Sequence, residues 1–352
     1  MSPESSPYSH PDAPVRHSYP VTVAHAGIGT AVSLTMRTLP YAVVRFGVLL
    51  GFTAATIVWF VVTVGGASLL GATIHPWVGT FWLVAGLGAY GWAWWFVVRY
   101  ALYLITAGHV AVLTELVTTG RIGAGSEGMF AYGKRIVLER FGEVNVLFGV
   151  DLLVRGIVHA FNRTLSLISR LIPLPALRLV VRLANAVVRA TTAYITQTIF
   201  SYNLARGDGN VWRSSKDALI YYGQNSTELL KTAVWIVVVD IVLTVALWAV
   251  MLAPAFVLAA ILPASAKAAG FVVALAIAAL LASNVRQAFL KPVFLVMIMT
   301  RFHALVRHQA INLEWDERLS HVSRKFGQLK DNASAAPAPP LSPAAPAAAP
   351  GI

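Results

Sequence analysis

The sequence predicts an all-α polytopic membrane protein with two transmembrane hairpins flanking amphipathic interfacial helices. The first observation is composition: 57% of the 352 residues are hydrophobic and only 12% are charged, whereas soluble domains are about 25% charged. The second is a mean hydropathy of +0.68, which leaves too little polar surface to coat a water-soluble globule. The third is a set of long apolar runs, of which one is interrupted by a single charge, Asp240.

Four of these runs are long enough to cross a bilayer, since a spanning helix needs about 20 mostly apolar residues. They cover residues 46–64, 76–98, 234–262 and 268–284. The second run carries tryptophans at both ends, as is typical of the interfacial belts of membrane helices. The last run continues into a further apolar stretch, 292–300, and Pro292 predicts a kink there.

Basic residues are distributed unevenly around the four runs. The connection 65–75 contains no Lys or Arg, and the connection 263–267 contains only Lys267. The opposite ends of the runs are basic, with Arg37, Arg45, Arg99, Lys216, Lys231, Arg301 and Arg307. Positively charged ends remain in the cytoplasm. We therefore expect a multi-pass plasma-membrane protein with both termini cytoplasmic.

Composition divides the chain into six segments. Both tails are low in apolar residues that could form a core, and the last is almost wholly Ala, Pro and Ser. The segments are a disordered cytoplasmic tail (1–28), a first transmembrane hairpin (29–110), an amphipathic helical cytoplasmic or interfacial region (111–230), a second transmembrane hairpin (231–310), a surface helix (311–332) and a disordered Ala/Pro tail (333–352).

A short repeat relates the two hairpins. Arg37-Thr38 precedes the first run, and Lys231-Thr232 precedes the third. His109 and His303 each follow an even-numbered run, three residues after a threonine. The distance along the chain from Arg37 to Lys231 equals that from His109 to His303. Two alternatives explain it, a parallel duplication and coincidence in a low-complexity apolar chain.

The central region contains a helix with a narrow polar stripe. Between residues 176 and 203 the polar side chains recur at helical spacing. They are Arg178, Arg182, Asn185, Arg189, Thr192, Thr196 and Asn203. One interpretation is a helix in the inner interface, with Arg178, Arg182 and Arg189 on lipid phosphates. The alternative is a helix within the bundle whose stripe lines a pore.

The residues that commonly carry out catalysis are sparse. The chain has no cysteine, which excludes disulfides, iron–sulfur clusters and thiolate zinc sites. Its glycine-rich stretch 120–128 lacks the lysine and the strand of a phosphate-binding loop. The histidines do not recur at metal-ligand spacing. We therefore expect no enzyme, cofactor or metal. The net charge of +12 indicates anionic lipid, and no nucleic-acid-binding motif accompanies it.

Asp240 is the most informative residue, because it lies inside an otherwise uncharged span. A carboxylate at that depth requires a partner or a wet cavity. As a functional group it would bind a cation, with Trp235 and Trp248 supplying cation–π attraction. As a structural group it would pair with Arg45, Arg286 or Lys291. The candidate transport residues are Asp240, Trp235, Trp248, Asn284 and Arg286.

Three short motifs resemble the C-terminal part of the choline transporter-like membrane proteins. They are Ala193-Tyr194-Ile195, Ser215-Lys216-Asp217-Ala218 and Val237-Val238-Val239-Asp240. The similarity extends over roughly residues 185–305. It implies a polytopic plasma-membrane protein that carries choline-like cations, and Asp240 is the one site residue that it transfers to this chain.

Two functions follow as hypotheses. The first is a transporter of a small organic cation, with Asp240 facing the pathway. The second is a non-transporting scaffold or oligomeric assembly protein whose basic helices bind anionic phospholipid and whose partners include further copies of the chain. A carrier requires polar residues from several spans to converge at mid-depth. A scaffold would leave Asp240 paired in a packed interior.

Overall fold

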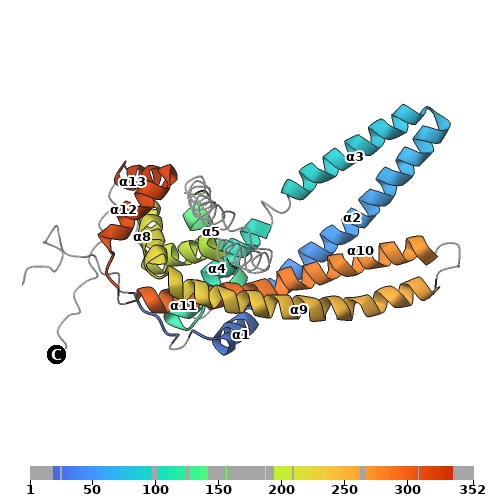
Figure 1. Ribbon diagram of the computed structural model, residues 1–352. Helices are drawn as coiled ribbons and strands as arrows, with labels where there is room; N and C mark the ends of the chain where they lie inside the picture. Colours follow the sequence, from blue (N-terminus) through green and yellow to red (C-terminus); the bar gives the residue numbers. More distant parts are fainter. Residues whose placement is uncertain are drawn as a thin grey trace, which may run out of the picture.

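The described residues form helices and no β-strand (Figure 1), which confirms the predicted all-α class. The computed structural model describes residues 19–23, 26–96, 102–123, 127–141, 156, 187, 194–207, 210–261, 267–307 and 309–335. Four segments in these ranges are long and apolar enough to cross a membrane: Leu39–Thr73, Leu102–Thr119, Ser226–Pro254 and Gly270–Val306. The chain is therefore an integral membrane protein.

Two long helical hairpins project from one side of a helical body and diverge from each other (Figure 1). The first consists of α2 (Leu39–Thr73) and α3 (Pro76–Phe96), and the second of α9 (Ser226–Ile261) and α10 (Lys267–Val285). α2 has 35 residues and α9 has 36. At about 1.5 Å per residue, both exceed the ~30 Å thickness of a bilayer core. Each long helix can therefore cross a membrane and still reach the body.

The second predicted span forms α3, but α3 is not among the four segments that are long and apolar enough to cross a membrane. Its Trp, Tyr and Gly residues lower its mean hydropathy, although it carries no charge and lies along α2. α4 (Leu102–Thr119) is one of the four instead. In the apolar stretch of α4, 67% of the residues are buried inside the protein, against 17% in that of α2. The apolar side chains of α4 therefore pack in the core of the body. The sequence pattern alone did not indicate this burial.

The hairpin arms present large apolar side chains on their outer surfaces. Val61 is 67% exposed and Trp77 is 64% exposed on the first hairpin, and Val245 is 65% exposed on the second. Contiguous apolar surface of this kind is unfavourable in water. Acyl chains of a bilayer would cover it, which agrees with the predicted transmembrane hairpins.

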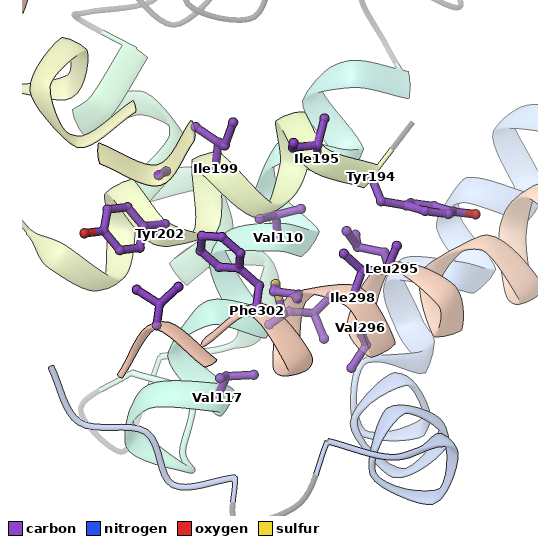
Figure 2. Close-up of a cluster of buried hydrophobic side chains, with 14 of the residues drawn as sticks. Val110, Val117, Tyr194, Ile195, Ile199, Tyr202, Leu295, Val296, Ile298 and Phe302 are labelled. Atoms are coloured by element: carbon purple, nitrogen blue, oxygen red, sulfur yellow. The ribbon is translucent and has the colours of Figure 1, made fainter. Parts of the chain in front are cut away.

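The body has a single large hydrophobic core. α4, α11 (Lys291–Val306) and the helical residues 194–206 meet in it (Figure 2). Val110 and Val117 come from α4, and Phe302 comes from α11. Tyr202, which is fully buried, contacts the ring of Phe302 edge-on at a centroid distance of 6.0 Å. Among the described residues, the body also contains α1 (Ile28–Arg37), α5 (Met129–Phe141), α8 (Val211–Gln224), α12 (Leu313–Val322) and α13 (Arg324–Ala335).

The predicted irregularity near Pro292 is a π-helical turn, η2 (Arg286–Leu290), between α10 and α11. Proline has no amide hydrogen and its ring crowds the preceding turn, so the regular hydrogen-bond ladder cannot continue through it. A π-helical turn accommodates this defect and commonly marks a functional or strained position. Here it turns Arg286 toward α9.

The two halves of the chain resemble each other in layout. In each half, a long helix is followed by its hairpin partner and then by a helix that packs in the body, α4 in the first half and α11 in the second. His109 lies on α4 and His303 on α11, and both side chains are buried. This arrangement agrees with the duplication alternative.

The segment expected as one surface helix forms two helices separated at Ser323. α13 packs against α8, and its Phe326 and Leu329 are fully buried. Half of this segment therefore belongs to the core. The sequence favoured a surface helix because its charged residues outnumber its apolar ones.

Candidate functional site at the junction of the hairpins and the body

Asp240 is bound to an arginine. Nε of Arg286 donates to Oδ1 of Asp240 at 2.8 Å, and a second guanidinium nitrogen contacts Oδ2. Arg286 is the first residue of η2, so the π-helical turn places the guanidinium opposite α9. This two-point pairing fixes both side chains and occupies both carboxylate oxygens. The geometry is that of the structural alternative.

The two tryptophans of the same span do not surround Asp240. Trp235 is 68% exposed and Trp248 is 42% exposed. At 100° per residue, Trp235 lies roughly 140° around α9 from Asp240, and Trp248 roughly 80°. Both rings therefore lie on the outer surface of the hairpin, where indole rings suit lipid, and these two tryptophans do not enclose the carboxylate.

Asn284 joins the two hairpins. Its Nδ2 donates to Oγ1 of Thr53 at 2.7 Å and to the carbonyl of Leu49 at 3.4 Å. The side chain is 5% exposed. A buried amide of this kind needs its partners, so Asn284 holds α10 against α2 and is not available for a transported ligand.

Two further cations lie beside the Asp240–Arg286 pair. Packing of Phe46 against Phe289, with ring centroids 5.6 Å apart, brings α2 against η2. This contact places Arg45 next to the segment that holds Arg286 and Lys291. Lys291 interacts electrostatically with both arginines and with the carboxylate. We call Arg45, Asp240, Arg286 and Lys291 the junction cluster, which contains three cations and one anion.

Arg45 and Lys291 have no bonded partner among the described residues. The Nε–H of Arg45 is buried and donates to no acceptor there. Neither side chain takes part in a hydrogen bond or ion pair within that part of the chain, whereas Asp240 is already engaged by Arg286. The junction cluster therefore has an excess of positive charge, which disfavours a cation and favours an anion.

The predicted lipid-contact residues Arg178, Arg182 and Arg189 lie outside the described residues. Their interfacial and pore-lining interpretations both stay predictions.

A chain of buried hydroxyl and imidazole groups runs through the body. Tyr19 Oη is 2.6 Å from Nδ1 of His303, and Ser201 Oγ is 2.8 Å from Nε2. Thr114 donates to Ser201 at 2.8 Å. A serine beside a histidine is an arrangement used by hydrolases, but here Ser201 and His303 are both 0% exposed. These hydrogen bonds therefore link α4, α11 and the helical residues 194–206, and a substrate cannot reach Ser201 or His303.

The cavity that the sequence did not indicate lies in the body, between α4 and α5, and has a volume of about 340 Å³. Its polar lining includes Glu115, Tyr132 and Glu139. Tyr132 Oη donates to Glu115 at 2.9 Å. Burial and this hydrogen bond raise the pKa of Tyr132 well above its usual value, so the hydroxyl stays protonated. The one available signal was Glu115, a lone charge in an apolar helix.

The fold and the junction cluster together define an integral membrane protein in which two long helical hairpins project from a helical body. Comparison with protein-family models, curated proteins and solved structures finds no match to this chain. The resemblance to choline transporter-like proteins stays a prediction.

Proposed function

We propose that this protein is a non-transporting membrane scaffold that holds its helical body at the inner surface of the plasma membrane. The observation that carries the proposal is the pairing of Asp240 with Arg286. A cation carrier needs that carboxylate free for its substrate. In the junction cluster it is neutralised, and the residual charge of Arg45 and Lys291 would repel a cation.

The orientation in this proposal follows from charge. Loops that stay in the cytoplasm are rich in Lys and Arg, and the basic residues gather where the hairpins join the body. The hairpin tip at residues 74–75 has no Lys or Arg. The body and both termini then lie on the cytoplasmic side. Anionic phospholipid and further copies of the chain are the partners that suit such a scaffold.

The experiment is uptake by proteoliposomes containing the purified full-length protein. Radiolabelled choline and tetramethylammonium are offered with and without proton and sodium gradients. We expect uptake equal to that of protein-free vesicles. Chemical crosslinking in native membranes supplies the positive measurement, because a scaffold should yield specific crosslinks between copies or to a partner. Protein-dependent uptake that Asp240→Asn abolishes would refute the scaffold role.

The cavity supports a second candidate function, binding of a small organic cation by the body. Carboxylates are groups that recognise quaternary ammonium ions, and Glu115 and Glu139 line this cavity. Glu139 pairs with Arg135, whose guanidinium also lies 5.3 Å from the centre of the Tyr132 ring, so Glu115 is the carboxylate on which this candidate function depends. The choline transporter-like resemblance supplies the choice of probe.

The test of cation binding compares choline with its neutral isostere 3,3-dimethylbutanol in a thermal-unfolding assay. A cation site predicts stabilisation by choline only, and its loss in Glu115→Gln. Glu314→Gln is the matched control, because Glu314 lies outside the cavity, is exposed, and pairs with Arg318 of its own helix, α12. Equal effects of the two ligands would exclude a cation site.

A further inference from the structure

The junction cluster contains two partly buried cations, Arg45 and Lys291, that have no bonded counter-charge among the described residues. Arg45 Nε is inaccessible to solvent and has no hydrogen-bond acceptor among the described residues. Lys291, one turn beyond Arg286, is partly buried and also unpaired in that part of the chain. Buried cations are normally paired, because transfer of an unpaired charge from water is strongly unfavourable. A missing anion would account for both residues.

The surroundings of the cluster indicate where that anion comes from. Arg45 lies in the first two turns of α2, the helix that leads from the body into the exposed arm of the first hairpin (Figure 1). Its neighbours Val43 and Val44 are 53% and 43% exposed, and Leu50 is 41% exposed. Apolar surface thus borders the cluster on the side that faces the bilayer. A ligand with an anionic head and acyl chains matches this combination.

The ligand chemistry follows from the donors. A guanidinium presents a fork of N–H groups that matches two oxygens of a phosphoryl group, and a lysine ammonium adds a point charge. Arg286 uses its fork on Asp240, so it orients the cluster and contributes its field. Arg45 and Lys291 are the two groups left to bind oxygen atoms.

We propose that Arg45 and Lys291 form a binding site for the phosphoryl headgroup of an anionic phospholipid, wedged between the two hairpins at the level of the inner leaflet. This site deepens the proposed scaffold function and rests on it for the position of the bilayer. The phosphoryl group of the bound lipid offsets positive charge in the junction, by one unit for a phosphodiester and by up to two for a phosphomonoester, and the acyl chains of the lipid cover the adjoining valines. Its phosphoryl group links α2 to α11 and thereby holds the two hairpins together at their base.

The experiment measures thermal unfolding of the full-length protein in a neutral detergent. Phosphatidylglycerol, phosphatidic acid, phosphatidylcholine and inorganic phosphate are added separately at equal concentrations. We expect the two anionic lipids to raise Tm by about 3–5 °C, as expected for a ligand at roughly a hundred times its Kd. Phosphatidylcholine and inorganic phosphate should not. Stabilisation by inorganic phosphate would assign the site to a soluble phosphoryl ligand instead.

The variant Arg45→Gln/Lys291→Gln should lose the lipid-dependent shift. In neutral detergent it should melt no lower than the unmodified protein, because it no longer buries uncompensated charge. The matched control is Lys231→Gln/Arg307→Gln, which removes two exposed cations from the same side of the hairpins and should keep the shift. Retention of the full shift by the first variant, or its equal loss in the control, overturns the proposal.

Two further measurements keep the test decisive. Native mass spectrometry should detect one tightly retained anionic lipid per protein. If the double variant does not fold, the charge-conserving variant Arg45→Lys takes its place and should retain the lipid. Absence of a retained lipid in a folded protein overturns the site. Cation uptake would overturn the scaffold role alone, whereas the absence of any anionic-lipid effect in a non-transporting protein would overturn the lipid site alone.

Discussion

At the scale of single residues, the pairing of Asp240 with Arg286 gives the clearest prediction. Asp240→Asn keeps the shape of the side chain but removes the charge that neutralises Arg286. Because the side chains are 19% and 36% exposed, the cost is below that of a fully buried pair, and we expect roughly 1–3 kcal/mol of destabilisation. Thermal unfolding in detergent measures it.

A double-mutant cycle tests the physical reason. Arg286→Gln in the Asp240→Asn background removes the unpaired cation and should recover part of the lost stability. Glu228→Gln is the control, because Glu228 pairs with Lys231 and Arg301 at a more exposed position and its loss should lower the stability less. Additive single and double effects would contradict the pairing.

At the scale of elements, α2 and α3 approach closely at a glycine contact near the hairpin tip. A Cβ at Gly79 would collide with the carbonyl of Ala67 and lie 2.9 Å from Cα of Gly71. Both obstacles are backbone atoms that cannot rotate away. Gly79→Ala should therefore separate the helices and cost about 1–3 kcal/mol, measured as a lower Tm and faster proteolysis of the hairpin.

Gly88→Ala is the control for this contact. It lies on the same helix, and nothing is within 4 Å of its added Cβ. Alanine is the better helix former, so this variant should be neutral or slightly stabilising. If both glycine variants destabilised the hairpin equally, helix propensity or lipid contact would be the cause in place of α2–α3 packing.

At the scale of the whole molecule, the hairpins and the body should lie on different sides of the inner membrane surface. The chain has no cysteine, so single introduced cysteines report topology cleanly. Ile74 is 64% exposed at the tip of the first hairpin, and Leu313 is 77% exposed on the body. We expect a membrane-impermeant maleimide to label Ile74→Cys in intact cells and Leu313→Cys only after permeabilisation. The reverse pattern would invert the proposed orientation.

The sequence by itself determined the class of this protein and the four arms of its hairpins. Long apolar runs are unfavourable in water, so α2, α3, α9 and α10 follow from composition with little tertiary information. The sequence also identified Asp240, because a lone carboxylate in an apolar run needs a partner. It offered Arg286 as one of three candidate partners, with Arg45 and Lys291.

Only the tertiary structure decided which cation pairs with Asp240 and what remains unpaired. That choice depends on the π-helical turn before Pro292 and on the packing of Phe46 against Phe289, and neither is encoded in local periodicity. The burial of α4 in the body is similar, because an apolar helix has the same pattern in a lipid bilayer and in a protein core. Long-range packing separates these cases, since it alone determines whether lipid or protein covers an apolar face.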